Sequence, residues 1–416
     1  MKMPHLKVYN TIFFFSCITT GVYVFIWYVG IEPYNTPFEE SLNITLHRPN
    51  VTGENHPSNG EQPLRATSQR PLERNRALNV SIGAEKTTKI IYIWDRPPWL
   101  FSTFGTTTRD FEDAGCPVYN CRLVDESTYT AADRSKADSI LFTIRDFFEK
   151  DKPQRTSRDQ IWVMWHNEAP LHDHPVRFEQ LNDYFNLTFS YLDEPQTDIY
   201  RPMGRILPRP ANIRYRPPGR SILNNKTSLV AWIVSNCRSK GQRNEYVNEL
   251  SKYIGVDIYG RCGMNCSREN DYCFKMVTRD YKFYLSFESM YCEDYMTEKL
   301  WRPLSGFIVP VVLGGANYSA VLPRRSFIDV RDFNSPADLA RYLKYLDAND
   351  DEYLAYFKWK EKYIAVSQSL PGLCDLCEIL QTPSYPFKSK FRFDKYWDPD
   401  RYCKVGKDER LALHLE

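Results

Sequence analysis

The sequence predicts an α/β protein whose globular part contains two units, each built on an open parallel sheet. β-prone and helical segments alternate through most of the chain after its first 88 residues. The stretch Tyr281–Gly315 shows the pattern most completely, as strand, loop, helix and strand. Within it, Lys282–Phe287 is aromatic and β-prone. Phe307–Leu313 is an apolar run rich in β-branched residues, typical of a parallel strand buried on both faces.

The loop and helix of this stretch concentrate charged side chains. We expect Asp294 to be the N-cap of a helix over Tyr295–Leu304 that ends at Gly306. The loop follows a strand's carboxyl end, where open α/β sheets bind ligands. A ribose needs a carboxylate, and a diphosphate needs cations and helix-start N–H groups, although a solvated, salt-bridged helix face would carry the same residues. The residues concerned are Glu288, Asp294, Glu298 and Lys299, beside the aromatic Tyr284.

Composition narrows the class of protein. The 416 residues carry a formal net charge of +2, which argues against a general nucleic-acid binder. Their number allows two domains of ordinary size. Aromatic residues make up 15% of the chain, which suits a large core and stacking on sugars and bases.

The N-terminus predicts a signal anchor. Residues 11–31 are apolar and uncharged, and roughly 20 such residues span a bilayer. Lys2 and Lys7 precede this run and Glu32 follows it, so the positive-inside rule places residues 1–10 in the cytosol and the rest in the lumen. A cleaved signal peptide is the alternative, but the run is long for one and has no convincing small-x-small cleavage site.

Residues 32–88 predict a flexible luminal stem. They are poor in apolar residues and rich in Pro, Asn, Arg and Glu, so they cannot bury enough surface to offset their chain entropy. Sequons for N-glycosylation suit a luminal chain. They stand at Asn43, Asn50 and Asn79 in the stem and at Asn186, Asn225, Asn265 and Asn317 beyond it.

Residues 89–210 predict the first α/β unit and residues 211–370 the second. Strands are expected in the first unit at Lys89–Trp94, Leu123–Asp125, Ser139–Thr143 and Gln160–Trp165, with helical or loop segments at Tyr129–Lys136 and Arg145–Lys150. The segment Arg201–Pro218 is rich in Pro and Arg, breaks the alternation and is expected to be the linker. In the second unit we expect, besides the central stretch, strands at Leu229–Ser235, Val256–Tyr259 and Phe327–Val330 and helices at Gln242–Tyr253, Pro336–Leu346 and Asp351–Lys362.

Two further places carry candidate chemistry. Ser235, Asn236 and Arg243 follow a strand, and Arg243 opens the next helix, where a phosphate would meet backbone N–H groups. Ser-Asn after a strand is more often an ordinary N-cap. Glu168 follows the fourth strand and would project from a carboxyl strand edge, although a surface Glu in a loop is the commoner situation. There Glu168 could act as a general base. His166 is the alternative base, because the natural pKa of histidine lies closer to neutral pH.

Metal and cysteine patterns favour disulfides over a metal site. The one Asp-x-Asp triplet, Asp398–Asp400, is interpreted as a turn, and Cys374-x-x-Cys377 has no second pair at zinc-site spacing. Of the 11 cysteines, Cys17 lies in the predicted span and the others face an oxidising lumen. Cys237 and Cys262 follow adjacent parallel strands, which favours a bridge, and Cys266 and Cys273 could close a small loop. The pairing of Cys292 and Cys403 stays open.

A long run of motifs closely resembles the signature of α1,3-fucosyltransferases, glycosyltransferase family 10. It reads KFYLSFE…EDYMTEKLW…VPVVLGG…RRSFIDVRDFNSPADLARYLKYLD…YFKWK, preceded by VAWIVSNC and VDIYGRCG. It covers most of Leu229–Lys360 and, more weakly, Lys89–Leu207. The resemblance implies the GT-B plan, in which two Rossmann-like domains face a cleft. It places the acceptor mainly on residues 89–210 and the donor mainly on residues 211–370.

The resemblance also implies roles for single residues. Arg243 and Lys299 look like the cations that hold the donor diphosphate, Glu298 like the ribose ligand, and Tyr284, Glu288, Ser235 and Asn236 like donor neighbours. Glu168 looks like the general base, with Ala169 where the family has Ser, and Ser289 stands where the family usually has Asn. Cys116 and Cys121 are expected to pair with Cys374 and Cys377, which would tie residues 371–416 to the first domain.

The implied function is an inverting type II Golgi membrane enzyme. It would transfer L-fucose from GDP-fucose to the 3-hydroxyl of GlcNAc on a glycoprotein glycan. The SNC…YGRCG…C…C arrangement looks most like the branch acting on the innermost N-glycan GlcNAc. Antennal acceptors of Lewis, LacNAc or LacdiNAc type are the alternative, and a catalytically silent Golgi glycan-binding protein is the alternative of another class. No cofactor is expected to be required, although Mn²⁺ or Mg²⁺ could stimulate transfer. No nucleic acid is expected as a partner, and a homodimer stays open.

Overall fold

The structure is a computed structural model that describes residues 87–94, 107–130, 132–144, 153–155, 157, 159–170, 178–212, 215–267, 269–367 and 371–404. The predicted membrane span, nearly all of the predicted stem, Cys17, the segment Arg145–Lys150 and the sequons at Asn43, Asn50 and Asn79 lie outside these residues. Within them, no helix is both long enough and apolar enough to cross a membrane.

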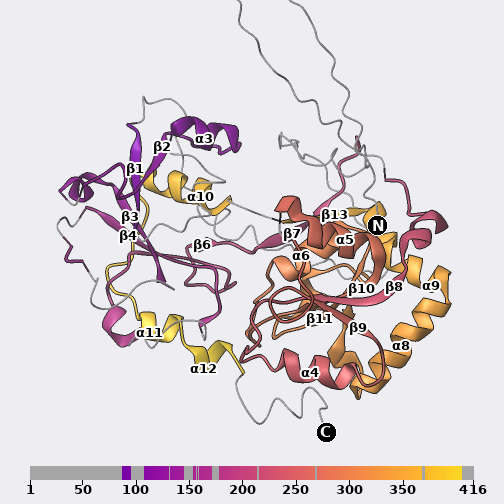
Figure 1. Ribbon diagram of the computed structural model, residues 1–416. Helices are drawn as coiled ribbons and strands as arrows, with labels where there is room; N and C mark the ends of the chain where they lie inside the picture. Colours follow the sequence, from indigo (N-terminus) through magenta and orange to yellow (C-terminus); the bar gives the residue numbers. More distant parts are fainter. Residues whose placement is uncertain are drawn as a thin grey trace, which may run out of the picture. The chain divides into compact units, whose positions relative to one another are not determined.

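The first unit is an open six-stranded sheet whose neighbouring strands all run parallel (Figure 1). Its order is β2-β1-β3-β4-β5-β6, with β1 Lys89–Trp94, β2 Cys121–Val124, β3 Ser139–Thr143, β4 Ile161–His166, β5 Leu187–Ser190 and β6 Ile199–Tyr200. The first four strands lie within two residues of their predicted bounds, and the last two were not predicted. Helix α3, Thr108–Asp113, packs Phe111 into the core on one face.

The second unit is a five-stranded parallel sheet covered by helices on both faces. Its order is β12-β11-β10-β8-β9, with β8 Ser228–Ile233, β9 Val256–Tyr259, β10 Tyr281–Phe287, β11 Val309–Leu313 and β12 Ile328–Asp329. Helices α4 (Arg243–Leu250) and α8 (Pro336–Ala348) pack on the face that carries Phe283 and Phe287. Helix α5 (Tyr272–Asp280) packs on the opposite face, beside Tyr284. All seven residues of β10 are buried, Lys282 and Ser286 included, as expected of a parallel strand covered on both faces.

The central unit agrees with its prediction except at the start of its helix. Helix α6 spans Glu298–Ser305 and ends at Gly306, as expected, but its N-cap is Thr297. The prediction of Asp294 as N-cap is therefore wrong. Asp294 adopts a left-handed backbone with φ 56°, and its carboxylate accepts a hydrogen bond from the Asp193 N–H at 3.1 Å. The three residues before the helix are non-helical because buried Glu288 accepts the Thr297 N–H at 2.7 Å.

The predicted linker contains a strand. Strand β7, Gly204–Pro208, pairs antiparallel with β13, Tyr363–Ser367, so the connection after the first sheet is a two-stranded ribbon. Its Pro-rich sequence concealed it, because proline cannot donate to a ladder and is tolerated only on edges. The predicted helix Asp351–Lys362 is a short α-helix, α9 (Asp350–Leu354), followed by the 3₁₀ helix Ala355–Glu361. Another short helix, α7 (Tyr318–Val321), follows β11.

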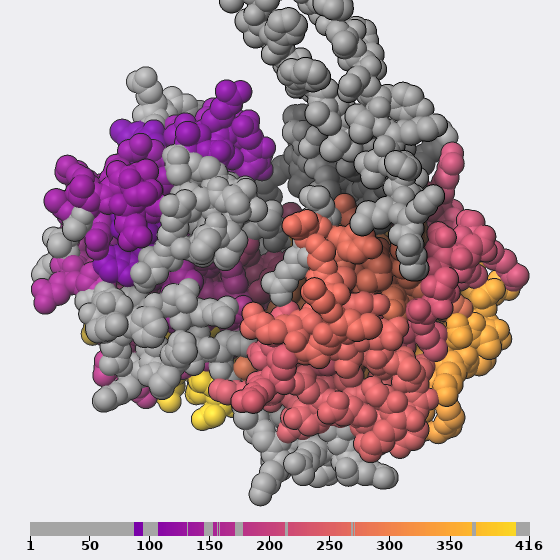
Figure 2. Space-filling view, in the orientation of Figure 1, coloured from indigo at the N-terminus to yellow at the C-terminus, as the bar shows by residue number. Residues whose placement is uncertain are grey.

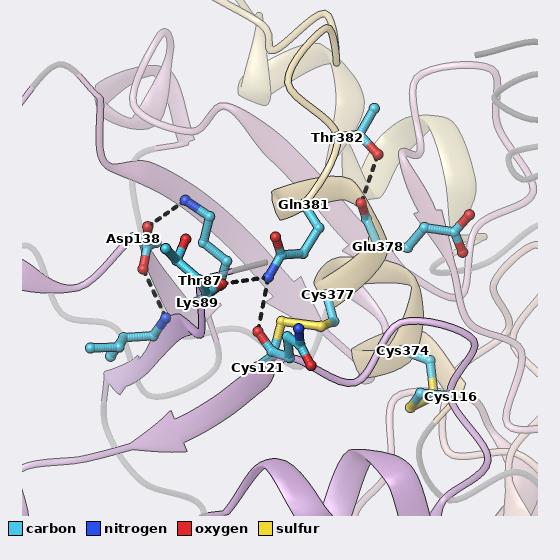
Figure 3. The surroundings of a disulfide bond; sticks show 12 residues. Thr87, Lys89, Cys116, Cys121, Asp138, Cys374, Cys377, Glu378, Gln381 and Thr382 are labelled. Atoms are coloured by element: carbon cyan, nitrogen blue, oxygen red, sulfur yellow. Dashed lines mark hydrogen bonds and ion pairs between the residues drawn. A yellow bond between two sulfur atoms is a disulfide. The ribbon is translucent and has the colours of Figure 1, made fainter. Parts of the chain in front are cut away.

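The C-terminal segment returns to the first sheet and covers both of its faces. Helix α10, Pro371–Leu380, packs Leu373 and Leu376 on the face that carries Phe111. Helices α11 (Phe393–Tyr396) and α12 (Pro399–Tyr402) contribute to the core of the other face. Part of the segment is visible in yellow beside the magenta residues in Figure 2. Figure 3 shows Cys121–Cys377, which joins α10 to the start of β2, and Cys116–Cys374, which joins α10 to the segment between α3 and β2.

Three further disulfides join the remaining cysteines that the structure describes. Cys237–Cys262 and Cys266–Cys273 form as expected, and the open pair Cys292–Cys403 is also bridged. The last bond fastens the end of α12 to the loop after β10. The described cysteines are therefore all held in disulfides, in agreement with an oxidising compartment.

The four described sequons differ in exposure. Asn225, Asn265 and Asn317 are exposed. Asn186 is half-buried, donates its amide N–H to the Lys388 carbonyl at 3.0 Å, and accepts the Trp162 N–H at 2.9 Å. These contacts hold the Asn186 side chain against the C-terminal segment and β4.

Candidate active site

A cavity of about 560 Å³ lies at the carboxyl ends of β8 and β10. Its lining residues are Glu168, Ile233, Val234, Ser235, Asn236, Arg243, Asp271, Cys273, Phe274, Tyr284, Ser289, Tyr295, Glu298, Lys299 and Arg302. Glu168 comes from the first sheet, just beyond β4, and the others come from the second unit. A second hollow of about 440 Å³ lies beyond β11 and β12, and none of the predicted catalytic or donor-site residues lines it.

The cavity brings together seven of the eight predicted catalytic and donor-site residues. Glu168, Ser235, Asn236, Arg243, Tyr284, Glu298 and Lys299 all line it. Glu288 does not line it, and is 2% exposed. Its carboxylate accepts the N–H and the hydroxyl of Thr297, so Glu288 fixes the start of α6 from beneath.

Arg243 is a buried cation at the first residue of α4. Its guanidinium donates to the carbonyls of Phe287 and Asn236, each at 3.0 Å, and stands 5.5 Å from the centre of the Trp232 ring. Its Nε is buried and has no hydrogen-bond partner among the described residues. Burial lowers the pKa of Arg243, with Glu288 opposing the shift, yet an arginine side chain keeps its charge in proteins. The cavity wall therefore holds a fixed positive charge.

Close contact between two loops sets the position of Arg243. The Gly241 N–H donates to the Ser289 carbonyl at 3.0 Å, and a Cβ at Gly241 would lie 2.8 Å from the same oxygen. Glycine is thus required where the loop after β8 meets the loop after β10. Gln242 follows with φ 51° and precedes the first turn of α4.

Lys299 supplies a second cation, held by carboxylates. Its Nζ lies 2.8 Å from Thr297 Oγ1, 3.1 Å from Glu298 Oε1 and 3.5 Å from Glu288 Oε2. Burial acts to lower the pKa of Lys299, but the charges of Glu288 and Glu298 outweigh it and raise that pKa above its ordinary value. Lys299 is therefore charged throughout the physiological range. The Glu298 side chain remains 54% exposed at the cavity.

An aromatic and charged wall, not predicted from the sequence, completes the second-unit side. Arg302, one turn further along α6, forms an ion pair with Asp271 and stands 4.1 Å from the centre of the Phe274 ring. Phe274 meets Tyr284 edge to face, with ring centres 5.8 Å apart. In the sequence, Arg302 could have been recognised as a site residue only from its spacing of four residues from Glu298, which puts both side chains on one helix face.

Glu168 faces this wall and contacts it through Tyr295. The Tyr295 hydroxyl donates to Glu168 Oε2 at 2.7 Å, while the Glu168 N–H donates to His166 Nδ1 at 3.1 Å. The His166 ring is 2% exposed, stacks on Trp397 at 5.0 Å and does not line the cavity. Of the two candidate bases, only Glu168 therefore reaches the space that a substrate could occupy.

The described residues contain no group of three or more His, Cys, Asp or Glu side chains placed to hold a metal ion. The Asp-x-Asp triplet has a local structural use instead, because Asp398 is the N-cap of α12 and accepts the Asp400 N–H. Arg243, Lys299 and Arg302 are the cations of the cavity. The arrangement can bind a polyanion against these cations and present a carboxylate opposite it.

Comparison with known proteins supports this chemistry. Residues 223–395 match the family described as glycosyltransferase family 10 (fucosyltransferase) C-term, and residues 86–204 match fucosyltransferase, N-terminal. The chain is 32% identical over 361 residues to alpha-(1,3)-fucosyltransferase C of Drosophila melanogaster, covering 80% of this chain and 84% of that protein.

Two further matches have lower coverage or likeness. Glycoprotein 3-alpha-L-fucosyltransferase A of Drosophila melanogaster is 38% identical over 256 residues, covering 60% of this chain and 49% of that protein. A crystal structure described as alpha1,3-fucosyltransferase with GDP-fucose is 16% identical with a TM-score of 0.46, covering 76% of this chain and 98% of that one. On the family matches and the first relative, this chain is a glycosyltransferase and belongs to the α1,3-fucosyltransferases of glycosyltransferase family 10.

Proposed function

We propose that this chain transfers L-fucose from GDP-fucose to the 3-hydroxyl of a GlcNAc residue, with inversion and without an obligatory metal. The observation that carries the proposal is one cavity in which Glu168 faces Arg243 and Lys299. In the proposed step, the acceptor oxygen attacks C1 of fucose while the bond from C1 to the phosphate oxygen breaks. GDP leaves with the bonding electrons, and the acceptor proton passes to Glu168.

The leaving diphosphate needs its developing charge stabilised. Arg243 and Lys299 are the proposed partners, with Arg302 on the same wall. The buried Nε of Arg243 supports this role, because a buried donor costs free energy unless a ligand satisfies it. Glu298, more than half exposed at the cavity, is the proposed ligand of the ribose hydroxyls, and Tyr284 is the proposed nucleotide neighbour. Glu288 supports the site by holding Thr297 and Lys299.

Glu168 suits the general base because inversion by single displacement needs one proton acceptor on the side opposite the leaving group. Ala169 stands where the family has Ser and is fully buried, and Glu168 beside it lines the cavity. His166 lies behind it, against Trp397.

The acceptor we propose is the innermost GlcNAc of an N-glycan. The arrangement of Cys237, Cys262, Cys266 and Cys273 around the donor loops supports this choice, as does the relative named glycoprotein 3-alpha-L-fucosyltransferase A. We further propose a type II Golgi membrane protein anchored by residues 11–31, on the sequence argument alone. Protease added to intact microsomes should then spare the domain after Lys89.

The full-length protein, purified in detergent, tests the reaction and the acceptor together. It is incubated with labelled GDP-fucose and a panel of core and antennal glycans, and the linkage is determined by mass spectrometry. We expect α1,3-linked fucose on the core GlcNAc. Label only on antennal GlcNAc would overturn the proposed acceptor. Absence of both hydrolysis and transfer of GDP-fucose would overturn the proposed reaction.

The base assignment is tested by Glu168→Gln, which keeps size but cannot take the proton. We expect kcat to fall roughly 10²–10⁴-fold, with GDP affinity near wild type. His166→Ala is the matched comparison. Near-normal transfer by Glu168→Gln with loss in His166→Ala would make His166 the base.

A further inference from the structure

Tyr295 connects the two halves of the active site. It lies on the loop after β10, is 2% exposed and lines the cavity, yet its hydroxyl donates to Glu168 beyond the first sheet. The donor–acceptor distance is 2.7 Å, typical of a charge-assisted O–H···O bond. Its ring centre stands 5.2 Å from that of Tyr191, which follows β5. The ring is therefore held from the same sheet that carries Glu168.

The loop that carries Tyr295 is anchored at three points. Cys292 is bonded to Cys403, and the Glu293 N–H donates to the Tyr402 carbonyl at 2.7 Å. The next residue of the loop, Asp294, accepts the Asp193 N–H from the first unit at 3.1 Å. The loop is thus fixed both to the C-terminal segment and to the first unit. Such anchoring suits a side chain whose distance from a partner has to be kept within tenths of an ångström.

We propose that Tyr295 is the positioning residue of Glu168, an inference that rests on the proposed function. By holding Oε2, the phenol sets the orientation of the carboxylate, so that Oε1 takes the proton of the acceptor hydroxyl. The phenol also stabilises the ionised carboxylate, because a hydrogen bond donated to a charged form favours that form.

The phenol is suited to donate and not to lose its proton. Burial raises the pKa of Tyr295 well above its ordinary value, and the nearby charges of Glu168 and Glu288 raise it further. It therefore remains neutral at any working pH. A removed hydroxyl should raise the pKa of Glu168, since one stabilising contact of its charged form is gone.

Other charged and titratable groups face Glu168 and are unchanged when Tyr295 is replaced. His166 accepts the Glu168 N–H from within the same strand end. Across the cavity stand the remaining charged lining residues, which are Arg243, Lys299, Arg302, Glu298 and Asp271. A shift in the pH profile of a Tyr295 variant can therefore be assigned to loss of the Tyr295 hydroxyl, because the other charged groups near Glu168 are the same in both proteins.

The test is Tyr295→Phe in the full-length protein, which keeps the ring and removes the hydroxyl. We expect kcat to fall about 10-fold or more, and the acid limb of its pH profile to move up by about one unit, as loss of one hydrogen bond to a carboxylate implies. GDP affinity and thermal stability should stay near wild type. Tyr353→Phe is the matched control, because that buried hydroxyl donates to the Lys282 carbonyl at 2.9 Å and does not line the cavity.

A second measurement separates positioning from packing. If Tyr295 acts through Glu168, adding Tyr295→Phe to Glu168→Gln should cause little further loss, whereas independent roles would give additive losses. An unchanged pH profile with a raised KM for GDP-fucose would overturn the inference and make Tyr295 a donor contact. If Glu168→Gln itself remains active, the proposed base fails, whatever Tyr295→Phe does. Wild-type behaviour of Tyr295→Phe beside an inactive Glu168→Gln overturns only the positioning role.

Discussion

Replacing Lys299 with methionine tests the proposed cation scheme through one charge. The Lys299 side chain is 23% exposed and contacts Thr297, Glu298 and Glu288 within 3.5 Å. A charge-assisted hydrogen bond is worth roughly 1.5–3 kcal/mol. The lower part of that range applies here, because Glu298 and Glu288 already neutralise part of the charge. A loss of about 1.5–2 kcal/mol corresponds to GDP binding that is roughly 10- to 30-fold weaker.

A change in the protonation of Glu288 limits the loss further. Burial already raises the pKa of Glu288, so without its cation it will take up a proton more readily and the cavity will lose less than one net charge. Calorimetric titration with GDP at low and high ionic strength measures the effect. The difference in GDP affinity between Lys299→Met and wild type should become smaller at high salt, because partly exposed charges are screened.

Lys282→Met is the matched control for loss of a lysine held in an ion pair. Lys282 is 9% exposed and pairs with Asp347 at 2.8 Å, away from the cavity lining. It should lower thermal stability and leave GDP affinity unchanged. Equal GDP affinity in Lys299→Met and wild type, or an equal loss in Lys282→Met, would refute the reasoning.

Three other outcomes follow from the same structure. Transfer should remain substantial in a chelator, and complete loss reversed by Mn²⁺ would contradict the cation scheme. Burial lowers the pKa of Lys360 to about 7, so between about pH 7 and 10 the unfolded chain binds a proton that the folded chain has released, and the stability of the wild type rises with pH. The Tm of Lys360→Met relative to wild type should therefore fall as pH rises. A Tm difference that stays constant with pH would contradict this pKa argument. A Cβ at Gly204 would lie 2.2 Å from the Trp301 ring, so Gly204→Ala should cost about 1–3 kcal/mol in denaturant unfolding, whereas Gly255→Ala, with open space around it, should not.

Much of the fold could be predicted from local patterns, because buried parallel strands leave a strong signal. β11 is a continuous apolar run and β10 is rich in aromatic residues, and their parallel pairing is confirmed. The missed strands lacked that signal. β6 has two residues, and β7 lies in a Pro-rich segment whose pairing with β13 depends on residues about 160 positions away.

The site could be predicted only in part. The resemblance supplied the residues, but Glu288 lies beneath the cavity because its carboxylate is used by Thr297. Asp271 and Phe274 reach the site through the sheet order, which no local pattern encodes. Tyr295 was placed within a helix, where its contact with Glu168 could not be expected.

The two disulfides of α10 make the order of synthesis a problem for this chain. Cys116 and Cys121 pair with cysteines 258 and 256 residues further on. At about 5–20 residues per second, roughly 10–50 s pass between synthesis of the two partners. Other cysteines emerge during that wait, namely Cys237, Cys262, Cys266, Cys273 and Cys292. The domain made first can thus form these two bonds only after the second domain has been synthesised, so we expect its maturation to depend on a disulfide isomerase that resolves premature pairs.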